Sequence, residues 1–468
     1  MNIKANNKST KNVKRRCLKK KKSCKQKIES FQIFQFVMQT GIVIKRHFPE
    51  FMELLSNVSD YRECPQYEVQ ELLIAVMCMF LFKRGSRNSM DNTVKKGHFA
   101  KNLEKMFGCT LPDLDTSDKL LRKLAPVEIE GIKQKLISHL IARKVLNKFR
   151  VFELYFVVAI DGTGVQSFDK EPYPECPYKV SKHGVYTWTA SVLEAKIVCN
   201  NGFSFSIATE WLKNPTDKEF DKQDCELKAF VRLSKKLKKS FPRLPVIIAA
   251  DGLYPNQTVF DICRDNNWNF IITLKNGNLK SVWEEIESLK KIGGVEKDSK
   301  YKTDATYHIV EDYTFINNIG YKNKYSLNVI EVLINKKHQK SGSKTEEYFA
   351  HITDLSISQN NCSLISHTGR LRWKIENEGF NEQKNSGYGL QHKYSRNSFN
   401  ATQNYYQCLQ IAHMINQLAH KSNKVKGMIC SNDTLKSFME CALAFIMWQE
   451  LENSSIEVLN NMKCQFRY

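Results

Sequence analysis

The segment Phe152–Gly164, with the sequence FELYFVVAIDGTG, decides the fold class that we predict for the chain. The part before Asp161 is rich in apolar, aromatic and β-branched residues, which is typical of a strand buried on both faces. The residues after Asp161 are small or polar. We therefore predict a central strand that leads into a polar loop, with Asp161 at the end of the strand.

Strands and helices alternate on the C-terminal side of this segment. The buried strand Pro245–Ala250 stops at a second aspartate, Asp251, which Gly252 follows. A hairpin, a basic periodic helix, a second helix and a further strand are also predicted: Trp188–Thr209, Cys225–Ser240, Thr258–Asn267 and Trp268–Leu274. Because a hairpin is combined with helical crossovers, we predict an α/β protein with a mixed-sheet core.

Residues 277–367 interrupt this alternation and are predicted to be an all-β insertion. Three strands are predicted in it: Tyr307–Ile316, Ser326–Ile334 and Glu346–Ile352. The chain then returns to helices at Arg370–Asn377 and Ala401–His420. The core is thus predicted in two parts, 151–276 and 368–422.

The two ends of the chain are predicted to be helical or basic. Residues 28–150 show helical periodicity and many Lys and Arg residues, so we interpret them as a DNA-binding region. Residues 1–27 contain many basic residues and no acid, as expected of a disordered tail that either binds phosphates or is simply solvated. Residues 423–468 are predicted to be a C-terminal helical extension.

The composition favours a polyanionic partner. The chain has 71 Lys and Arg against 49 Asp and Glu, a formal charge of +22, which favours nucleic acid first. Its 14 cysteines contain no C-x-x-C pair, so we expect reduced thiols in the cytoplasm rather than a zinc site. The longest apolar run, Leu72–Phe82, is too short to cross a bilayer, so no membrane partner is expected.

Asp161 and Asp251 carry the predicted chemistry. Each is expected where a buried strand ends beside a glycine, so both carboxylates can converge on hard cations. Glu376, on the predicted helix Arg370–Asn377, would complete a site for two Mg²⁺ ions, for which Mn²⁺ can substitute. Arg372 stands four residues before Glu376 on the same helical face and could bind a DNA phosphate. The alternative is that each aspartate caps a turn and that Arg372 and Glu376 form a simple salt bridge.

Other acids are given plainer roles. Glu210, Asp224 and Glu226 could help to position a metal ion or DNA, but we interpret them as helix-capping and solubilising residues. Glu378 competes with Glu376 for the place of the third carboxylate, but it lies about 200° away around an α-helix. Our prediction for the third carboxylate is therefore Glu376.

The residues around Glu376 also form a signature. They are RWKIENEGFN at 372–381, Lys384, and GYGLQH at 387–392. This pattern resembles the C-terminal signature of bacterial insertion-sequence DDE transposases that have a β-strand insertion in an RNase H-like core. Four further stretches are similar to the same group: AIDGTG at 159–164, VLEAK at 192–196, KQDCE at 222–226 and DGLY at 251–254.

The resemblance implies an RNase H-like, integrase-type core in which Asp161, Asp251 and Glu376 bind two Mg²⁺ and catalyse DNA cleavage. It implies that Arg372 and Lys384 contact transposon DNA. Asn377, which would add a polar contact beside the same cleft, and Trp373 are further candidates for DNA binding. Two weaker candidates are Trp283, for stacking on a flipped base, and His392, for a phosphate contact, although packing would also explain them. Where the related signature has a Tyr and a Lys, this chain has Gly369 and Gln383.

The sequence thus predicts a DNA transposase that cuts transposon ends and transfers the freed strand into target DNA. Its expected partner is double-stranded DNA, both transposon ends and target. Because two ends must be joined, we expect a homodimer. We expect the protein in the cytoplasm, associated with the nucleoid. Two alternatives remain: a domesticated or inactive transposase-derived DNA-binding protein, and a repair or junction nuclease on the same core.

Overall fold

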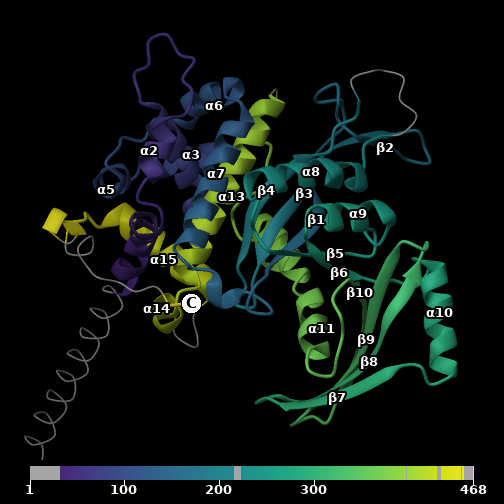
Figure 1. The fold of residues 1–468 in the computed structure, drawn as a ribbon. Coiled ribbons are helices and arrows are strands. Elements are labelled where there is room, and N and C mark those ends of the chain that lie inside the picture. The colour runs from purple at the N-terminus through teal and green to yellow at the C-terminus, as the bar shows by residue number, and fades with distance from the viewer. Residues whose placement is uncertain (1–31, 216–222, 397, 430–433, 455, 458–466) are drawn as a thin grey trace, which may run out of the picture. The chain divides into compact units, whose positions relative to one another are not determined.

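Two compact units make up the chain in the computed structural model, which describes residues 32–215, 223–396, 398–429, 434–454, 456–457 and 467–468 (Figure 1). One unit comprises Met1–Leu120 and Ile415–Tyr468, and the other comprises Leu121–Met414. The predicted basic tail, residues 1–27, lies outside the described residues.

The unit Leu121–Met414 is built on one mixed sheet, which has 10 strands in the described part of the chain. The first six strands are β1 (Phe156–Phe168), β2 (Tyr178–Val180), β3 (Tyr186–Val198), β4 (Ser204–Trp211), β5 (Val246–Ala250) and β6 (Asn269–Thr273). The last four are β7 (Glu296–Thr303), β8 (Tyr307–Tyr321), β9 (Tyr325–His338) and β10 (Lys344–Thr353). Their order is β2-β3-β1-β5-β6-β10-β9-β8-β7, and β4 pairs with β3 outside this path.

Antiparallel and parallel pairing meet at β1. On one side β1 pairs antiparallel with β3, which forms the predicted hairpin with β4. On the other side β1 pairs parallel with β5, and β5 pairs parallel with β6. The predicted α/β class with a mixed sheet is confirmed.

Helices cover both faces of this sheet. They are α7 (Pro126–Ala142), η1 (Asn147–Phe149), α8 (Glu226–Ser240), α9 (Gln257–Asp265), α10 (Lys280–Lys291), α11 (Cys362–Arg370), η2 (Ile375–Asn381), α12 (Glu382–Asn385) and α13 (Phe399–His420). The periodicity of α8 explains its place, because Phe230, Leu233 and Leu237 form its buried stripe while its lysines lie on the outer side.

The prediction of an all-β insertion at residues 277–367 is wrong in one respect. The three predicted strands are present as parts of β8, β9 and β10, but α10 and most of α11 also lie in this segment. The amphipathic sequence of α10 buries Val282 and Ile286, so a helix rather than a loop precedes β7. In addition, β10 pairs antiparallel with β6, so the inserted strands extend the core sheet.

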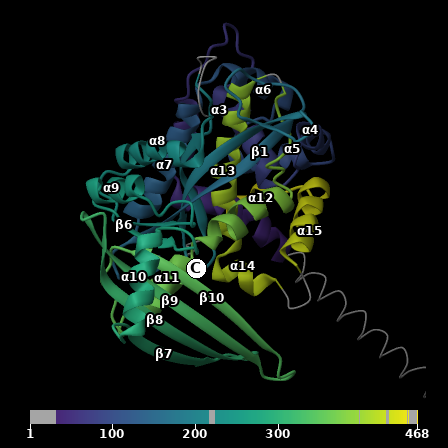
Figure 2. The same cartoon turned by 90° about the vertical axis from the view of Figure 1, so that its right-hand side faces the viewer.

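Two helices, α10 and α11, lie on either side of the extended sheet, as Figure 1 shows; Figure 2 gives the same part from the side of α10. Lys290 of α10 forms an ion pair with Glu331 of β9 at 2.8 Å. On the other face, the hydroxyl of Tyr313 of β8 donates to Ser363 of α11 at 3.2 Å. Glu331 pairs with Thr314 in the β8–β9 register, next to Tyr313, and neighbouring residues of a strand point to opposite faces. The β-rich part therefore has its own layered core.

The other unit is helical where it is described. It contains a helix at residues 32–47 and then α2 (Phe51–Ser56), α3 (Val69–Leu81), α4 (Arg87–Val94), α5 (Phe99–Phe107), α6 (Leu114–Lys123), α14 (Asn423–Met428) and α15 (Leu435–Trp448). The amide of Asn102 on α5 donates to the carbonyls of Ile446 and Gln449, both at 2.8 Å. The C-terminal helices are thus packed with N-terminal ones in one unit.

Two composition-based expectations can be compared with the structure. Among the described residues, no helix is both long and apolar enough to cross a membrane. The cysteines in the described ranges are free thiols, ten in number.

Candidate active site

Asp161 lies inside a strand, which corrects the prediction that the strand ends there. β1 continues to Phe168 and is paired with β3 over this whole stretch. The polar residues after Asp161 are compatible with a strand, because Thr163 and Gln166 are buried in the sheet together with the apolar Val165. What ends near Asp161 is the pairing with β5, whose last pair is Ala159 with Ala249.

The register of β1 and β5 brings Asp161 and Asp251 to the same level of the sheet. Ala159 pairs with Ala249, and each aspartate stands two residues beyond this last pair. Neighbouring strands lie about 4.8 Å apart, so side chains at equal register positions are close. The predicted convergence of these two acids is therefore supported by the backbone alone.

The charge of Asp161 is poorly stabilised at this position. Burial raises the pKa of its carboxyl, the guanidinium of Arg372 lowers it, and the charges of Glu226 and Asp251 raise it again, to about 6 overall. Nη1 of Arg372 lies 3.3 Å from Oδ2 of Asp161. One cation therefore compensates this acid only in part.

Asp251 follows β5 and is held by its own turn. Its Oδ1 accepts a hydrogen bond from the N–H of Leu253 at 2.8 Å, and its Oδ2 lies 3.3 Å from Nζ of Lys275. The stem of Lys275 crosses Gly252, since a Cβ at this glycine would lie 2.6 Å from Cγ and Cδ of the lysine. The glycine after Asp251 thus allows Lys275 to approach the carboxylate.

Glu226, the first residue of α8, is a third acid at this site. Its carboxylate lies over Gly162, where an added Cβ would be 2.3 Å from Oε1 of Glu226. The hydroxyl of Tyr254 donates to Oε2 at 3.1 Å. Burial raises the pKa of Glu226, the hydrogen bond from Tyr254 lowers it, and the charge of Asp251 raises it, with a net upward shift.

The capping role expected for Glu226 does not describe this arrangement. Its carboxylate faces Tyr254 and Gly162, and the helix N-cap is Cys225 without a side-chain cap bond. The sequence signal that could have revealed the position of Glu226 is Gly162. A glycine directly after Asp161 leaves room there for a side chain from another element. Tyr254 is 1% exposed, and its pKa is raised by burial and by the charges of Glu226, Asp161 and Asp251.

The predicted helix Arg370–Asn377 has a different geometry. α11 ends at Arg370, and after a turn the chain forms the π-helix η2, which includes Glu376, Asn377 and Glu378. A π-turn has more residues than an α-turn, so the four-residue spacing from Arg372 no longer fixes a shared face. Glu376 is exposed on η2, whereas Glu378 forms an ion pair with Lys374. Arg372 reaches Asp161, and the side chain of Glu376 is left open to solvent.

The remaining DNA-binding candidates lie on or near this segment. Trp373 is 46% exposed, and its ring centroid lies 5.4 Å from that of Phe349. Lys384 is half-buried on α12, and Asn377 is exposed. Gln383, which stands where the related signature has a Lys, is buried and exchanges hydrogen bonds with Gln410 at 2.9 and 3.1 Å. Its role in this chain is structural.

Two weaker candidates lie in different surroundings. Trp283 lines a cavity of about 510 Å³ together with Lys280, Glu331 and Tyr348. Its Nε1 donates to the carbonyl of Lys275 at 3.2 Å, and Lys275 is the residue that contacts Asp251. His392 is exposed and its ring packs edge-on against Tyr394 at 4.8 Å.

His351 fills the space beside Gly369, where the related signature has a Tyr. A Cβ at Gly369 would lie 2.4 Å from Cδ2 of His351. The imidazole is buried, and burial together with Arg370 and Arg372 lowers its pKa to about 4. Glycine is therefore required at 369 by the neutral ring of His351.

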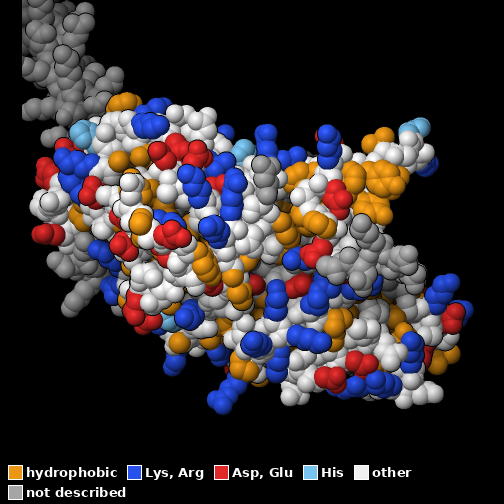
Figure 3. All heavy atoms as spheres, turned by 90° about the horizontal axis from the view of Figure 1, so that it is seen from above, with side chains coloured by type: hydrophobic (Ala, Val, Ile, Leu, Met, Phe, Trp, Pro, Cys, Tyr) orange, Lys and Arg blue, Asp and Glu red, His pale blue; other side chains and the backbone are white. Residues whose placement is uncertain are grey.

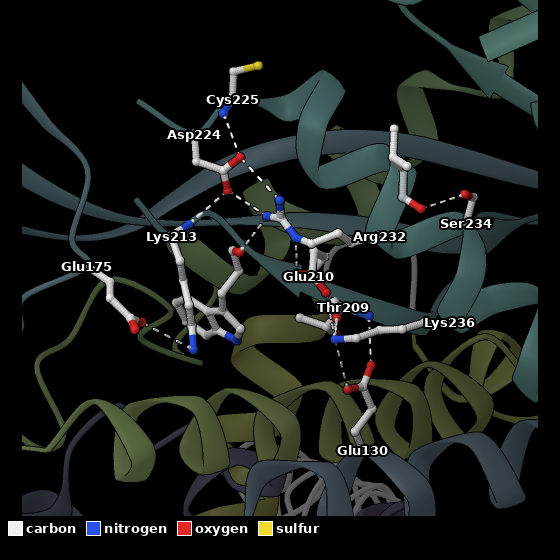
Figure 4. Close-up of polar contacts among 12 residues, drawn as sticks. Glu130, Glu175, Thr209, Glu210, Lys213, Asp224, Cys225, Arg232, Ser234 and Lys236 are labelled. Atoms are coloured by element: carbon white, nitrogen blue, oxygen red, sulfur yellow. Dashed lines mark hydrogen bonds and ion pairs between the residues drawn. The ribbon is translucent and has the colours of Figure 1, made fainter. Parts of the chain in front are cut away.

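A network of paired charges holds the start of α8 in place (Figure 4). Arg232 lies between Glu210 at 2.7 Å and Asp224 at 2.6 Å, and Lys236 contacts Glu210 at 2.7 Å. Oδ2 of Asp224 accepts the N–H of Lys213 at 2.9 Å, and its Oδ1 accepts that of Cys225 at 3.0 Å. Glu210 and Asp224 thus have structural roles, and they fix the helix end that presents Glu226.

The acids fit a hard divalent cation by their chemistry. The carboxylates of Asp161, Asp251 and Glu226 supply oxygen ligands of the kind that Mg²⁺ and Mn²⁺ prefer, and Gly162 and Gly252 leave room for the side chains of Glu226 and Lys275 to approach. Within the described residues, no group of three or more His, Cys, Asp or Glu side chains is arranged to hold a metal ion. The ligand set of Asp161, Asp251 and Glu376 stays a prediction.

Comparison with known proteins adds no assignment. No protein-family model matches the chain, and no curated protein matches it significantly.

Proposed function

We propose that this chain is a DDE-type DNA transposase with an RNase H-like core, which cuts DNA at transposon ends and joins the freed 3′ end to target DNA. The observation that carries the proposal is the equal register position of Asp161 and Asp251 on two parallel strands, with Glu226 reaching the same place over Gly162. The mixed sheet, the basic charge of +22 and the signature around Glu376 support it as well.

The acids would hold the metal ions. Asp161 and Asp251 are the primary ligands in this proposal, and Glu226 or the exposed Glu376 provides further oxygen ligands. Bound divalent ions activate the attacking water or 3′-hydroxyl and stabilise the leaving oxygen in phosphodiester cleavage.

The neighbouring cations would place the DNA strand. Arg372 contacts Asp161 at 3.3 Å and is only 12% exposed, so its guanidinium is held at the edge of the acid site. A bidentate guanidinium can bind a phosphate and remain next to the carboxylate. Lys275, whose Nζ is 3.3 Å from Asp251 and which is 60% exposed, can move to a phosphate when a cation takes its place.

The experiment that tests the proposal is cleavage of linear DNA that carries the inverted repeats flanking the coding region, in Mg²⁺. The proposal expects the wild type to nick at the repeat ends and Asp161→Asn to be inactive. Cleavage by Asp161→Asn at the wild-type rate would contradict it. A matched control is Asp261→Asn, which changes a surface aspartate on α9 that pairs with Arg264 and Lys324.

A second assay separates a transposase from a junction nuclease. DNA with a pre-cut end and a free 3′-hydroxyl is supplied together with a target plasmid. Joined products are expected from a transposase. A nuclease that cleaves branched DNA but forms no joined product would replace the proposal with the repair alternative.

A further inference from the structure

A two-stranded arm extends from the sheet beyond the acid site. It consists of β2 and the facing end of β3, residues Tyr178–Trp188, joined by a turn in which Ser181 N donates to Val185 O at 2.9 Å. Val180, Val185 and Tyr186 are 49%, 62% and 48% exposed. In Figure 3 a patch of hydrophobic side chains gathers on this arm. Apolar surface of this kind marks a binding surface rather than a core.

One face of the arm is an aromatic platform. Tyr178 pairs with Trp188 and Val180 pairs with Tyr186, and directly paired residues of antiparallel strands point to the same face. The rings of Tyr186 and Trp188 are stacked with centroids 5.6 Å apart, and Tyr178 lies 5.5 Å from Tyr186. The arm therefore offers flat aromatic faces at a fixed spacing.

A β-bulge makes this face continuous with the face that carries Asp161. Asp161 pairs with Glu194 and Phe168 with Trp188, and one extra residue, Val165, is inserted in β1 between Gly164 and Gln166. Without the bulge, Phe168 would point to the other face, because side chains alternate along a strand. The platform thus begins about 20 Å from Asp161, roughly six base-pair steps of DNA.

The charge of the arm suits a polyanion. Residues Tyr178–Trp188 include Lys179, Lys182 and His183 and no acid. At the base of the arm, Nζ of Lys393 lies 4.6 Å above the ring of Phe168. Interfaces between protein copies are depleted of lysine at their centre, whereas single-stranded nucleic acid is bound by aromatic faces flanked by cations.

We propose that this arm binds unpaired bases of the DNA strand next to the acid site, by stacking them on Tyr186, Tyr178 and Trp188. The inference rests on the proposed function, since it takes DNA as the substrate, and it adds a specific requirement for single-stranded DNA. Bases in a duplex are stacked on each other and expose no face to the platform, so the arm distinguishes frayed or extended ends from paired ones.

Fluorescence anisotropy with labelled DNA in EDTA tests the arm without any cleavage. The probes are a duplex with a 3′ single-stranded extension of about eight nucleotides and a blunt duplex of equal length. The variants are Tyr186→Ala and the conservative Tyr186→Phe, with Tyr301→Ala as the control at a tyrosine of β7 that is 76% exposed. Sedimentation of each free variant measures its oligomeric state.

We expect Tyr186→Ala to weaken binding of the extended duplex by about fivefold or more, with Tyr186→Phe and Tyr301→Ala close to wild type and with blunt-duplex binding unchanged. Equal binding of the extended duplex by Tyr186→Ala would overturn the proposal, as would an equal loss for both DNAs. A change of oligomeric state in Tyr186→Ala would assign the arm to a protein interface instead. Because this binding assay contains no metal, its result does not depend on cleavage. Absence of cleavage in the separate Mg²⁺ assay would count against the proposed function alone.

Discussion

Two groups of acidic side chains in the unit Leu121–Met414 differ in how their charges are compensated. Glu210 and Asp224 are paired with Arg232 at 2.7 and 2.6 Å, and Lys236 contacts Glu210 at 2.7 Å. In the other group, Asp161 and Asp251 each have one cation at 3.3 Å, and Glu226 contacts the neutral hydroxyl of Tyr254.

The difference separates acids that stabilise the fold from acids that are available for chemistry. The pKa of Asp161 lies near 6 and that of Glu226 is raised, so the charged form of each carboxylate is destabilised in the folded protein. Carboxylates with raised pKa values are common at functional sites, because a bound cation can stabilise their charged form. A divalent cation would do so for the second group.

After the loss of activity expected for Asp161→Asn, the largest effect is expected from neutralising Glu226. Glu226→Gln keeps the shape of the side chain and its contact with Tyr254 but removes one charge from the site. We expect the rate of Mg²⁺-dependent DNA cleavage to fall at least about 100-fold, since loss of even an outer partner of a metal costs 10- to 100-fold. Glu210→Gln is the matched control in the paired group, and an equal loss of rate in both would erase the distinction between them.

Replacing Asp161 should stabilise the metal-free protein. The folded pKa of Asp161, about 6, lies above the ordinary value of 3.8, so its charge destabilises the fold above pH 6. Asp161→Asn is expected to raise the free energy of unfolding at neutral pH by up to about 3 kcal/mol. The gain shrinks as pH falls from 6 and vanishes below about 3.8, because the wild-type carboxyl is then protonated in both states. Urea unfolding at several pH values measures this, and a gain independent of pH would contradict it.

Removing the arginine that pairs with Glu210 and Asp224 should lower the free energy of unfolding, in contrast to Asp161→Asn. Arg232→Met leaves Asp224, whose side chain is 3% exposed, and Glu210, 12% exposed, without their guanidinium. We expect a loss of about 2 kcal/mol in the free energy of unfolding. Arg264→Met removes a surface pair whose arginine is 53% exposed and should cost less than about 0.5 kcal/mol. Equal costs for the two variants would show that the network adds no stability.

The smallest effect is expected at the position where the related signature has a Tyr. Gly369→Ala forces a methyl group against the ring of His351, from which it would be 2.4 Å away. We expect a cost of about 1 kcal/mol in the free energy of unfolding. The double variant Gly369→Ala/His351→Ala should lose less than the sum of the two single changes, and strict additivity would contradict the contact.

Much of the fold could be predicted from local pattern. The strand Pro245–Ala250 corresponds to β5, residues 246–250, and the basic helix Cys225–Ser240 to α8, because their periodicity is set by burial on one or two faces. Which strands pair with each other could not be predicted from local pattern. That β1 continues past Asp161 depends on β3 supplying hydrogen-bond partners, and that the inserted strands extend the core depends on β10 meeting β6.

The site could be predicted only in part for the same reason. Asp161 and Asp251 carry a local signal, an apolar run that stops at an aspartate followed by glycine. Glu226 does not follow such a run, and its place depends on Gly162 of another element leaving room for it. For Glu376, the predicted α-helical face is replaced by a π-helix, whose formation no periodicity in the segment indicates.

The most direct test of the acid site is thermal unfolding of the wild type and of Asp161→Asn during titration with Mn²⁺. The wild type is predicted to gain stability as Mn²⁺ increases, by about 2.7 kcal/mol at 100 times the dissociation constant, while Asp161→Asn shows little gain. An equal gain in both proteins, or none in the wild type, would contradict the proposal that Asp161 is a ligand in a divalent-metal site.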